Sequence, residues 1–439
     1  MKIYLSMKKL ILNLSLIVFF IPMTYAQNAL TEHDAISIAL KYNYDILVAR
    51  NNASTDSVNN TRGNAGMLPT ISISGSESYS TAENVQQKLA DGTLVTSSNA
   101  KSNSLNASVG LDWTLFDGGK MFVTKRKLNE IQALGEIQFR DRVLQTVYDV
   151  ILAYYDVVRQ KQELASINEV ITYNLERVKI SQTSYDAGLS PKTNLLQAKI
   201  DLNVYQENAI NQQSIIIAAK RTLNQFLGRN ADISFEVLDS IPINDLIDKK
   251  ELVQKLDSSN TSILASKKQV DVSKLSLKEM NTLLFPRINF NAAYGLFQSN
   301  TPGSNPLTSR IIGPSVGGTI SIPVFQAGNA GRQIKIAKIQ LQSDEYNLES
   351  VRLQANQQLQ NALTQFENQL HLLRIEKDNA ILAKENMEIS IQRLRFGQTT
   401  SLEVSLAEGS FVESLTRLIS FEYNLKVAET KLKQLLSQF

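Results

Sequence analysis

Residues 105–115 have the sequence LNASVGLDWTL, in which apolar residues alternate with small or polar ones. Successive side chains of a strand point to opposite faces, so this segment predicts a β-strand with one apolar and one polar face. A strand that crosses a bilayer needs roughly 9–11 residues, and the segment is about that long. A soluble β-sandwich shows the same alternation, so the pattern alone leaves both interpretations open.

Three further segments share this alternation, and the four come as two isolated pairs with long stretches between them. Their polar faces hold mostly Ser, Asn, Gly and Thr, which suits a water-filled lumen and favours membrane strands. Trp113, Phe116 and Phe325 lie near the ends closest to the expected long helices, where aromatic residues mark a membrane interface, although plain packing explains any one of them equally well. The expected strands cover about residues 70–80, 104–116, 287–298 and 315–325.

Short motifs recur in the two halves of the chain, which predicts a duplicated structure with repeats at residues 27–233 and 234–439. Two motif pairs lie 217 residues apart and two lie 209 residues apart, so the first half is longer by eight residues between them. Length variation belongs in exposed loops, so we expect a longer loop within the first strand pair. The pairs are Asn43 with Asn260, Leu68-Pro69 with Phe285-Pro286, Phe116–Gly119 with Phe325–Gly328, and Tyr185–Gly188 with Leu394–Gly397.

Long helices are expected over about residues 119–186 and 328–396, because these stretches contain no proline and almost no glycine. At about 1.5 Å per residue, each would be near 100 Å long. Apolar residues at three-, four- and seven-residue steps predict helices packed side by side at coiled-coil angles. Shorter helices follow over about 190–227 and 400–437, and another pair precedes the strands near 31–66 and 249–284.

The turns between long and short helices are built alike in the two halves. Gly188 and Gly397 suit the left-handed conformation that ends a helix. Ser190 and Thr399, two residues later, are expected to cap the next helix, with Pro191 at its first position. The likeness of these two tips also suggests a shared contact surface.

Four strands are too few to close a barrel, and a membrane tolerates no open sheet edge. The chain is therefore expected to assemble with copies of itself. Two, three or four copies would give 8, 12 or 16 strands, and symmetry alone does not choose among them.

The first 26 residues are expected to form a secretory signal, cleaved before Gln27. Lys2, Lys8 and Lys9 precede an apolar run that is too short for a spanning helix. Without these lysines the charge falls from +3 to zero, and no basic excess remains for nucleic acid. The chain has no cysteine, so a disulfide framework and a thiolate metal site are excluded.

No arrangement of residues points to an enzyme or a cofactor. His33 and His371 lie far apart and lack motif partners, and there is no phosphate loop or nucleophile–base pattern. Asp112 and Asp117 stand at a strand end, where turn chemistry explains them better than paired acid–base catalysis.

These segments resemble the TolC-like outer-membrane efflux protein family over nearly the whole mature chain. The resemblance depends on the order, spacing and duplication of motifs that are weak singly. They are Leu30–Ile36, Ala39-Leu40, Asn43, Leu68-Pro69, Trp113–Gly119, Ile322–Phe325, and the two glycine tips with Ala198 and Ala407.

The resemblance implies an α+β membrane protein with a duplicated helix–β-hairpin–long helix–helix unit. Three copies would form a 12-stranded β-barrel on a long α-helical barrel in the outer membrane of a Gram-negative bacterium. Substrates would pass through a gate passively, from an inner-membrane pump and a periplasmic adaptor to the exterior. The tips would dock on the adaptor through Tyr185, Gly188, Leu189, Ser190, Gly397, Gln398 and Thr399.

Some family members carry an acidic ring six residues after the tip glycine. Here the matching positions hold Glu403 and Asn194, so Glu403 is a candidate entrance constriction, with a solvated helix residue as the alternative. Two rival functions stay open at this point: a periplasmic coiled-coil adaptor and a secreted coiled-coil structural protein. Neither accounts for duplicated strands of bilayer length.

Overall fold

The computed structural model describes residues 29–243, 249–301 and 308–439, so the expected signal peptide lies outside the described residues. The chain divides into two compact units, each built from segments of both sequence halves. The helical unit takes its residues from Met1–Asn43, Thr146–Ile247 and Thr364–Lys431. The sheet unit comprises Tyr44–Gln145, Asp248–Leu363 and Leu432–Phe439.

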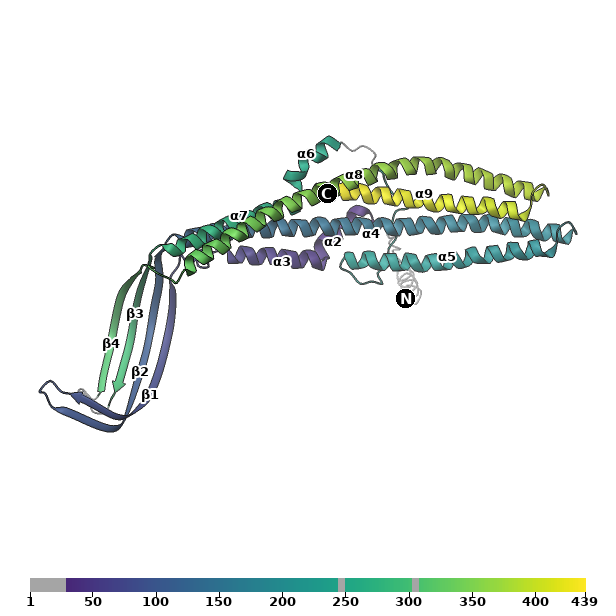
Figure 1. Ribbon diagram of the computed structural model, residues 1–439. Coiled ribbons are helices and arrows are strands. Elements are labelled where there is room, and N and C mark those ends of the chain that lie inside the picture. Colours follow the sequence, from purple (N-terminus) through teal and green to yellow (C-terminus); the bar gives the residue numbers. More distant parts are fainter. Residues whose placement is uncertain (1–28, 244–248, 302–307) are drawn as a thin grey trace, which may run out of the picture. The chain divides into compact units, whose positions relative to one another are not determined.

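The order of elements repeats from one half of the chain to the other (Figure 1). Among the described residues, each half has two helices, two strands, one long helix and one shorter helix. In the first half these are α2 (Glu32–Tyr42), α3 (Tyr44–Asn59), β1 (Thr70–Lys88), β2 (Leu94–Asp117), α4 (Lys120–Asp186) and α5 (Lys192–Phe226). In the second they are α6 (Lys249–Ser259), α7 (Thr261–Asn281) with the short 3-10 helix η1 (Thr282–Leu284), β3 (Arg287–Asn300), β4 (Thr308–Ser321), α8 (Asn329–Arg395) and α9 (Ser401–Leu435).

Asn43 and Asn260, the first pair of repeated motifs, break what the sequence suggested were single helices near 31–66 and 249–284. The side-chain amide of Asn43 donates to the carbonyl of Phe226 at the end of α5 (2.8 Å). Asn260 donates in the same way to Leu435 at the end of α9 (3.0 Å), and its oxygen caps α7 by accepting from the backbone N–H of Ile263 (3.1 Å). Each amide therefore satisfies a helix-end carbonyl that would otherwise lack a partner.

Helix α2 begins with a capping box, which explains the start of the Leu30–Ile36 motif. The hydroxyl of Thr31 accepts from the backbone N–H of Asp34, and the Asp34 carboxylate accepts from the Thr31 N–H. The Thr31 hydroxyl also donates to the Asp34 carboxylate (2.7 Å), and this bond, followed by the one from the Thr31 N–H, holds the pKa of Asp34 below its ordinary value. Ala35 and Ala39 on the inner face of α2 are fully buried.

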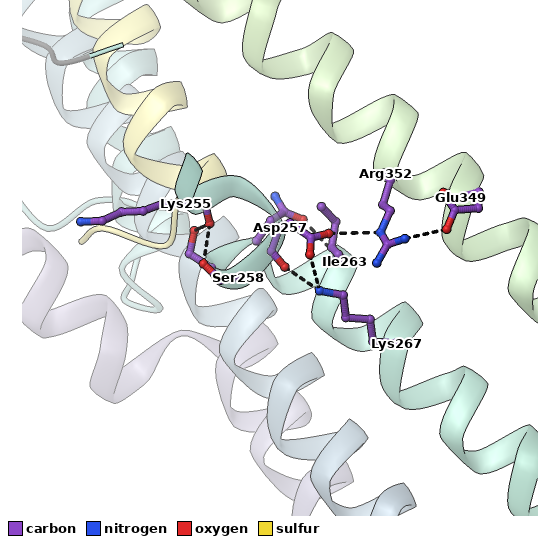
Figure 2. A network of polar contacts seen from close by, with 9 residues as sticks. Lys255, Asp257, Ser258, Ile263, Lys267, Glu349 and Arg352 are labelled. Carbon is purple, nitrogen blue, oxygen red and sulfur yellow. Dashed lines mark hydrogen bonds and ion pairs between the residues drawn. The ribbon is translucent and has the colours of Figure 1, made fainter. Parts of the chain in front are cut away.

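A network of charges holds α6 against α7 and α8 in the sheet unit (Figure 2). The Asp257 carboxylate of α6 accepts from Lys267 of α7 (2.7 Å) and from Arg352 of α8 (3.1 Å). Arg352 also reaches Glu349, one turn earlier on α8 (2.6 Å). The hydrogen bond from Lys267 and the charge of Arg352 keep the pKa of Asp257 below its ordinary value.

The four strands form one antiparallel sheet in the order β1-β2-β3-β4. The two hairpins meet where β2 pairs with β3, across a register that runs from Asn103 and Asn300 to Asp117 and Arg287. In the described residues β1 and β4 each have one strand neighbour, so both outer edges of the sheet are unpaired.

Four of the expected strand limits, on three of the strands, are wrong. β1 and β2 extend to Lys88 and from Leu94, well past residues 80 and 104, so the extra length of the first half lies in longer strands rather than in a longer loop. The alternation of apolar residues fades there, but hydroxyl pairs such as Ser80 with Ser102 (2.6 Å) continue the pairing. β4 spans Thr308–Ser321 rather than 315–325, and Pro323, which lacks an N–H, stands just beyond its end.

Gly118, between β2 and α4, occupies a position that no other residue fits. Its φ is +73°, and a Cβ there would lie 2.8 Å from the carbonyl oxygen of Thr282 and 2.7 Å from the Cβ of Phe285. The glycine of the motif Phe116–Gly119 thus packs directly against Phe285 of the motif Phe285-Pro286. Ala327, at the matching place in the second half, also has a positive φ of 49°.

We predict opposite effects for substitutions at these two matching positions. Gly118→Ala should lower the free energy of unfolding by about 2–4 kcal/mol, since it adds both left-handed strain and a clash with backbone. Ala327→Gly should raise it by up to about 1 kcal/mol, because it removes strain from a non-glycine residue. The apparent melting temperature of purified protein in detergent measures both. Equal effects of the two substitutions would contradict the interpretation that Gly118 is required by its surroundings and that Ala327 is strained.

Candidate functional site

One face of the sheet is apolar across all four strands. Strand pairing places Ile73, Val109, Tyr294 and Pro314 in one row, and Ile71, Leu111, Ala292 and Val316 in the next. The described part of the chain leaves this face uncovered: Ile73 is 84% exposed and Val316 is 72% exposed. Exposed apolar area of this extent needs a cover that is not water.

The opposite face is polar and carries rows of hydroxyl groups. Ser74 hydrogen-bonds to Ser108 (3.0 Å) and Ser78 to Ser104 (2.7 Å) across β1 and β2. The row at Glu77, Leu105, Gln298 and Arg310 introduces charge on the apolar side, which ends the apolar face. The apolar rows thus span roughly ten residues of strand, about the height of a bilayer core for tilted strands.

The three aromatic residues singled out in the sequence separate into two groups. Trp113 and Phe116 lie in β2 near α4, and the Trp113 indole N–H donates to the carbonyl of Met67 (3.1 Å). Phe325 lies beyond the end of β4 and is 86% exposed. The sequence pattern placed Phe290 on the apolar face, but it was not among the expected interface aromatics. It stands directly opposite Trp113 on β3 and shares its face. Its alternation with Asn289 and Asn291 was the available signal.

Asp117, at the end of β2, acts as a helix cap for α4. Both of its carboxylate oxygens accept from the backbone N–H of Met121 in the first turn of α4 (3.1 and 3.0 Å). The described residues contain no group of three His, Cys, Asp or Glu side chains that could hold a metal ion. Among them, too, no helix combines the length and apolar character needed to cross a membrane.

The two tips, Tyr185–Pro191 and Leu394–Thr400, lie at the same end of the bundle formed by α4, α5, α8 and α9 in the helical unit (Figure 1). Both have the same backbone. Gly188 (φ +73°) donates to Tyr185 and Leu189 donates to Ser184, while Gly397 (φ +67°) donates to Leu394 and Gln398 to Arg393. These paired bonds satisfy the last carbonyls of each long helix.

The expected caps at the tips are wrong in detail. Thr400, not Thr399, caps α9 by accepting from the backbone N–H of Glu403 (3.2 Å), and the Thr399 hydroxyl instead donates to the Glu403 carboxylate. On the first tip, Pro191 is the residue before α5 and Ser190 accepts from the Asn194 amide (3.0 Å). The two candidate constriction residues thus each contact a hydroxyl of their own tip.

The tips also expose apolar side chains. Leu189 is 83% exposed on the first tip, and Phe396, which was not among the expected contact residues, is 72% exposed on the second. Exposed apolar residues at the end of a polar bundle favour contact with another protein. Ala198 and Ala407, the residues that accompany the tips in the motif, are buried where neighbouring helices meet.

Helix α8 carries two apolar stripes, one buried and one exposed. Phe366, Leu373, Ala380 and Met387 form the buried stripe within the helical unit. The exposed stripe repeats every seven residues at Ile375, Leu382 and Ile389. A second exposed set lies on α5. It comprises Leu196, Ile200, Val204, Ile210 and Ile217. Helices with an apolar stripe left in water are incomplete as coiled coils.

A cluster of buried charges lies between the helices close to the tips, and sequence reasoning missed it. Arg177 of α4 is 1% exposed, and its guanidinium contacts Asp201 of α5 (2.9 Å) and Glu408 of α9 (3.3 Å). Arg177 also donates to the hydroxyl of Ser401, the first residue of α9 (2.9 Å). We call these four residues, with Asn174 and Tyr205, the buried ion cluster.

Two neutral side chains complete the cluster around Glu408. The Asn174 amide donates to its carboxylate (2.9 Å), and so does the Tyr205 hydroxyl. Burial, followed by the nearby Glu408 charge, raises the pKa of Tyr205, so this hydroxyl keeps its proton. The available signal was position: Asn174, Arg177 and Ser181 continue the three- and four-residue spacing of buried residues along α4 after Val170.

Neighbouring residues on opposite faces of β2 provide a test of the sheet's two faces. If the apolar face meets lipid, Val109→Lys should sharply reduce the amount of protein in the membrane fraction, since a lysine at mid-height on such a face costs about 2–4 kcal/mol. Ser108→Lys, on the polar face, should assemble nearly as the unchanged chain does. Quantitative blots of membrane fractions measure both. Equal assembly of the two variants would contradict the assignment of faces.

The comparison with known proteins agrees with this arrangement. Residues 35–229 and 252–438 match the model of a family described as outer membrane efflux protein. The chain is 23% identical over 325 residues to the outer membrane efflux protein BepC of Brucella suis biovar 1, covering 73% of this chain and 69% of that protein. It is 19% identical over 339 residues to the alkaline protease secretion protein AprF of Pseudomonas aeruginosa, covering 75% and 69%.

Solved structures show the same fold. The outer-membrane channel OprN has a TM-score of 0.76 at 17% identity, with 93% of this chain and 90% of that chain covered. The outer membrane protein VceC of Vibrio cholerae has a TM-score of 0.75 at 16% identity, with 92% and 95% covered. At these identities the likeness speaks for the fold alone.

The family match covers both halves of the chain and confirms the resemblance drawn from its motifs. It sets aside the two rival functions, a periplasmic adaptor and a secreted coiled-coil protein. The chain belongs to the outer membrane efflux protein family, and it is an outer-membrane channel for efflux or type I secretion.

Proposed function

We propose that three copies of this chain form a 12-stranded β-barrel in the outer membrane, continued by an α-helical barrel in the periplasm. The observation that carries the proposal is the four-stranded sheet, which is apolar on one face and unpaired at both edges. Closing it against other copies pairs the edges and turns the apolar face to lipid. The choice of three copies rests on the resemblance to the family.

The helices support the same assembly. The exposed stripes on α5 and α8 give each copy two apolar surfaces along the bundle, enough to contact a neighbour on either side of a ring. Closed rings of identical copies bury such surfaces without leaving an open end. The aromatic residues Trp113, Phe116 and Phe290 would then stand at the periplasmic interface of the membrane.

The tips are proposed to dock on a periplasmic adaptor protein that also binds an inner-membrane pump. Their matching backbones, and the exposed Leu189 and Phe396, give the two tips of one copy similar contact surfaces. The channel would then give gated, passive passage to cargo delivered by the pump. Two relatives bear names of protease secretion, AprF and PrtF, and another is named for efflux, so polypeptides and small molecules are both candidate cargoes.

Co-purification from native membranes tests the assembly and its partners. A tagged chain extracted in mild detergent should run as a trimer by native mass measurement and should bring an adaptor and a pump with it. Substituting Leu189 and Phe396 together by Asp should remove the adaptor and leave the trimer intact, because only the tips are changed. A monomer would contradict the proposal, as would a tip variant that recovers the adaptor in full.

Glu403 is proposed to face the channel near its inner end, where three copies would place three carboxylates. Its contact with Thr399 fixes the carboxylate near the start of α9 but leaves the side chain exposed. Glu403→Ala should lower the preference of the reconstituted channel for cations several-fold, measured as the reversal potential in a salt gradient. The control is Glu413→Ala, which changes an exposed carboxylate on the same helix but further from the tip. Unchanged selectivity in Glu403→Ala would exclude this residue from the constriction.

A further inference from the structure

The buried ion cluster links the two tips of a single copy. Arg177 lies on α4, eleven residues before Gly188 of the first tip. Ser401, which accepts from it, is the first residue after the second tip, and Glu408 lies two turns further along α9. One guanidinium therefore contacts the helices on the far side of both turns.

We propose that Arg177 is a positioning residue for docking, which sets the distance between the two tips by holding the start of α9 against α4 and α5. The proposal rests on the docking function proposed above. Arg177 would thus act on docking although it does not lie at the surface where the adaptor would bind.

The chemistry of the cluster fits positioning better than simple packing. A guanidinium has a rigid planar fork of donors, so its bonds hold only in one arrangement of the surrounding helices. Apolar contacts are not directional, and the nearby apolar cluster of Val170, Met387, Val404 and Phe411 would tolerate small shifts of α9. Apolar residues would also fill the space of a buried ion pair at no loss of stability.

The direction of the bonds shows which movement the cluster resists. The partners found for Glu408 are Arg177 and Asn174 on α4 and Tyr205 on α5. If α9 slid along α4, the Glu408 carboxylate would lose all three while remaining buried, whereas Arg177 would keep Asp201. A buried carboxylate without partners is strongly unfavourable, so α9 is held in one register relative to α4 and α5.

Two ion pairs between α4 and α8 contribute less to holding the tips in place. Lys384 of α8 pairs with Glu169 of α4 (2.8 Å), and Arg395 of α8 pairs with Glu176 of α4, but these side chains are exposed. Exposed ion pairs contribute little and are screened by salt. The spacing of the tips therefore depends mainly on the buried contacts of Arg177 and on the apolar cluster beside it.

The experiment measures the distance between the tips within one copy. The natural chain has no cysteine, so nitroxide labels can be placed at Lys192→Cys and Gln398→Cys alone. Co-expression with an excess of the cysteine-free chain leaves one labelled copy in most channels. Pulsed electron–electron double resonance then gives the distribution of distances between the two labels of that copy. The full-length chain in detergent should show one narrow distribution.

Three variants then loosen the cluster to different degrees. Arg177→Met and Glu408→Gln should at least double the width of the distribution, and Ser401→Ala, which removes one hydrogen bond, should widen it less. Glu413→Gln is the matched control on α9: it changes an exposed carboxylate paired with Arg417 and should leave the width unchanged. Unchanged widths in all three cluster variants would overturn the proposal. If Arg177→Met fails to assemble, the widths measured for Ser401→Ala and Glu408→Gln decide whether the proposal holds.

A second measurement separates positioning from stability. The adaptor recovered per trimer from native membranes should fall several-fold in Arg177→Met, and Arg177→Lys, which keeps the charge but loses the fork, should not restore it. Full adaptor recovery despite a widened distribution would overturn the role in docking. If the unchanged chain recovers no adaptor, the proposed docking function fails, and the widths still report whether Arg177 sets the distance between the tips.

Discussion

A strand edge in hydrocarbon leaves its N–H and C=O groups without partners, and this constraint governs the whole molecule. Among the residues that the structure describes, β1 and β4 each have one unpaired edge, and the apolar face between them is exposed. Closing the edges demands further copies, and further copies bring further helices. In the proposed trimer, the same closure would let neighbouring copies cover the apolar stripes on the outer surfaces of α5 and α8.

Because the chain is duplicated, both halves are built on one structural plan. Each half supplies one hairpin and one pair of helices, and the same small devices recur at matching places. Asn43 and Asn260 tie the ends of α5 and α9 to the helices that precede the strands. The tip glycines end α4 and α8 with the same pair of hydrogen bonds. Where the halves differ, as at Gly118 and Ala327, the backbone keeps its conformation although the second half lacks the glycine.

The sequence predicted the elements well because their signals are local and periodic. Alternation along residues 105–115 and the long stretches without proline depend only on neighbouring residues, and both correspond to elements of the structure. The limits of β1 and β2 were missed because strand pairing continues through hydroxyl contacts after the apolar pattern ends. The end of β4 was missed because Ile322 to Phe325 look like strand residues, although strand pairing stops at Ser321, before Pro323. The buried ion cluster was missed because it joins residues more than 200 positions apart, and no single segment shows that Arg177 meets Glu408.

The unequal hairpins have a consequence for the outer surface of the cell. β1 and β2 contain 19 and 24 residues, whereas β3 and β4 contain 14 each, so the first hairpin extends well beyond the charged row that ends the apolar face. In the proposed trimer, tall and short hairpins alternate around the mouth of the barrel. A ring built from six similar hairpins would look six-fold from outside. The proposed trimer would instead be three-fold, with three polar projections that any molecule outside the cell would meet first.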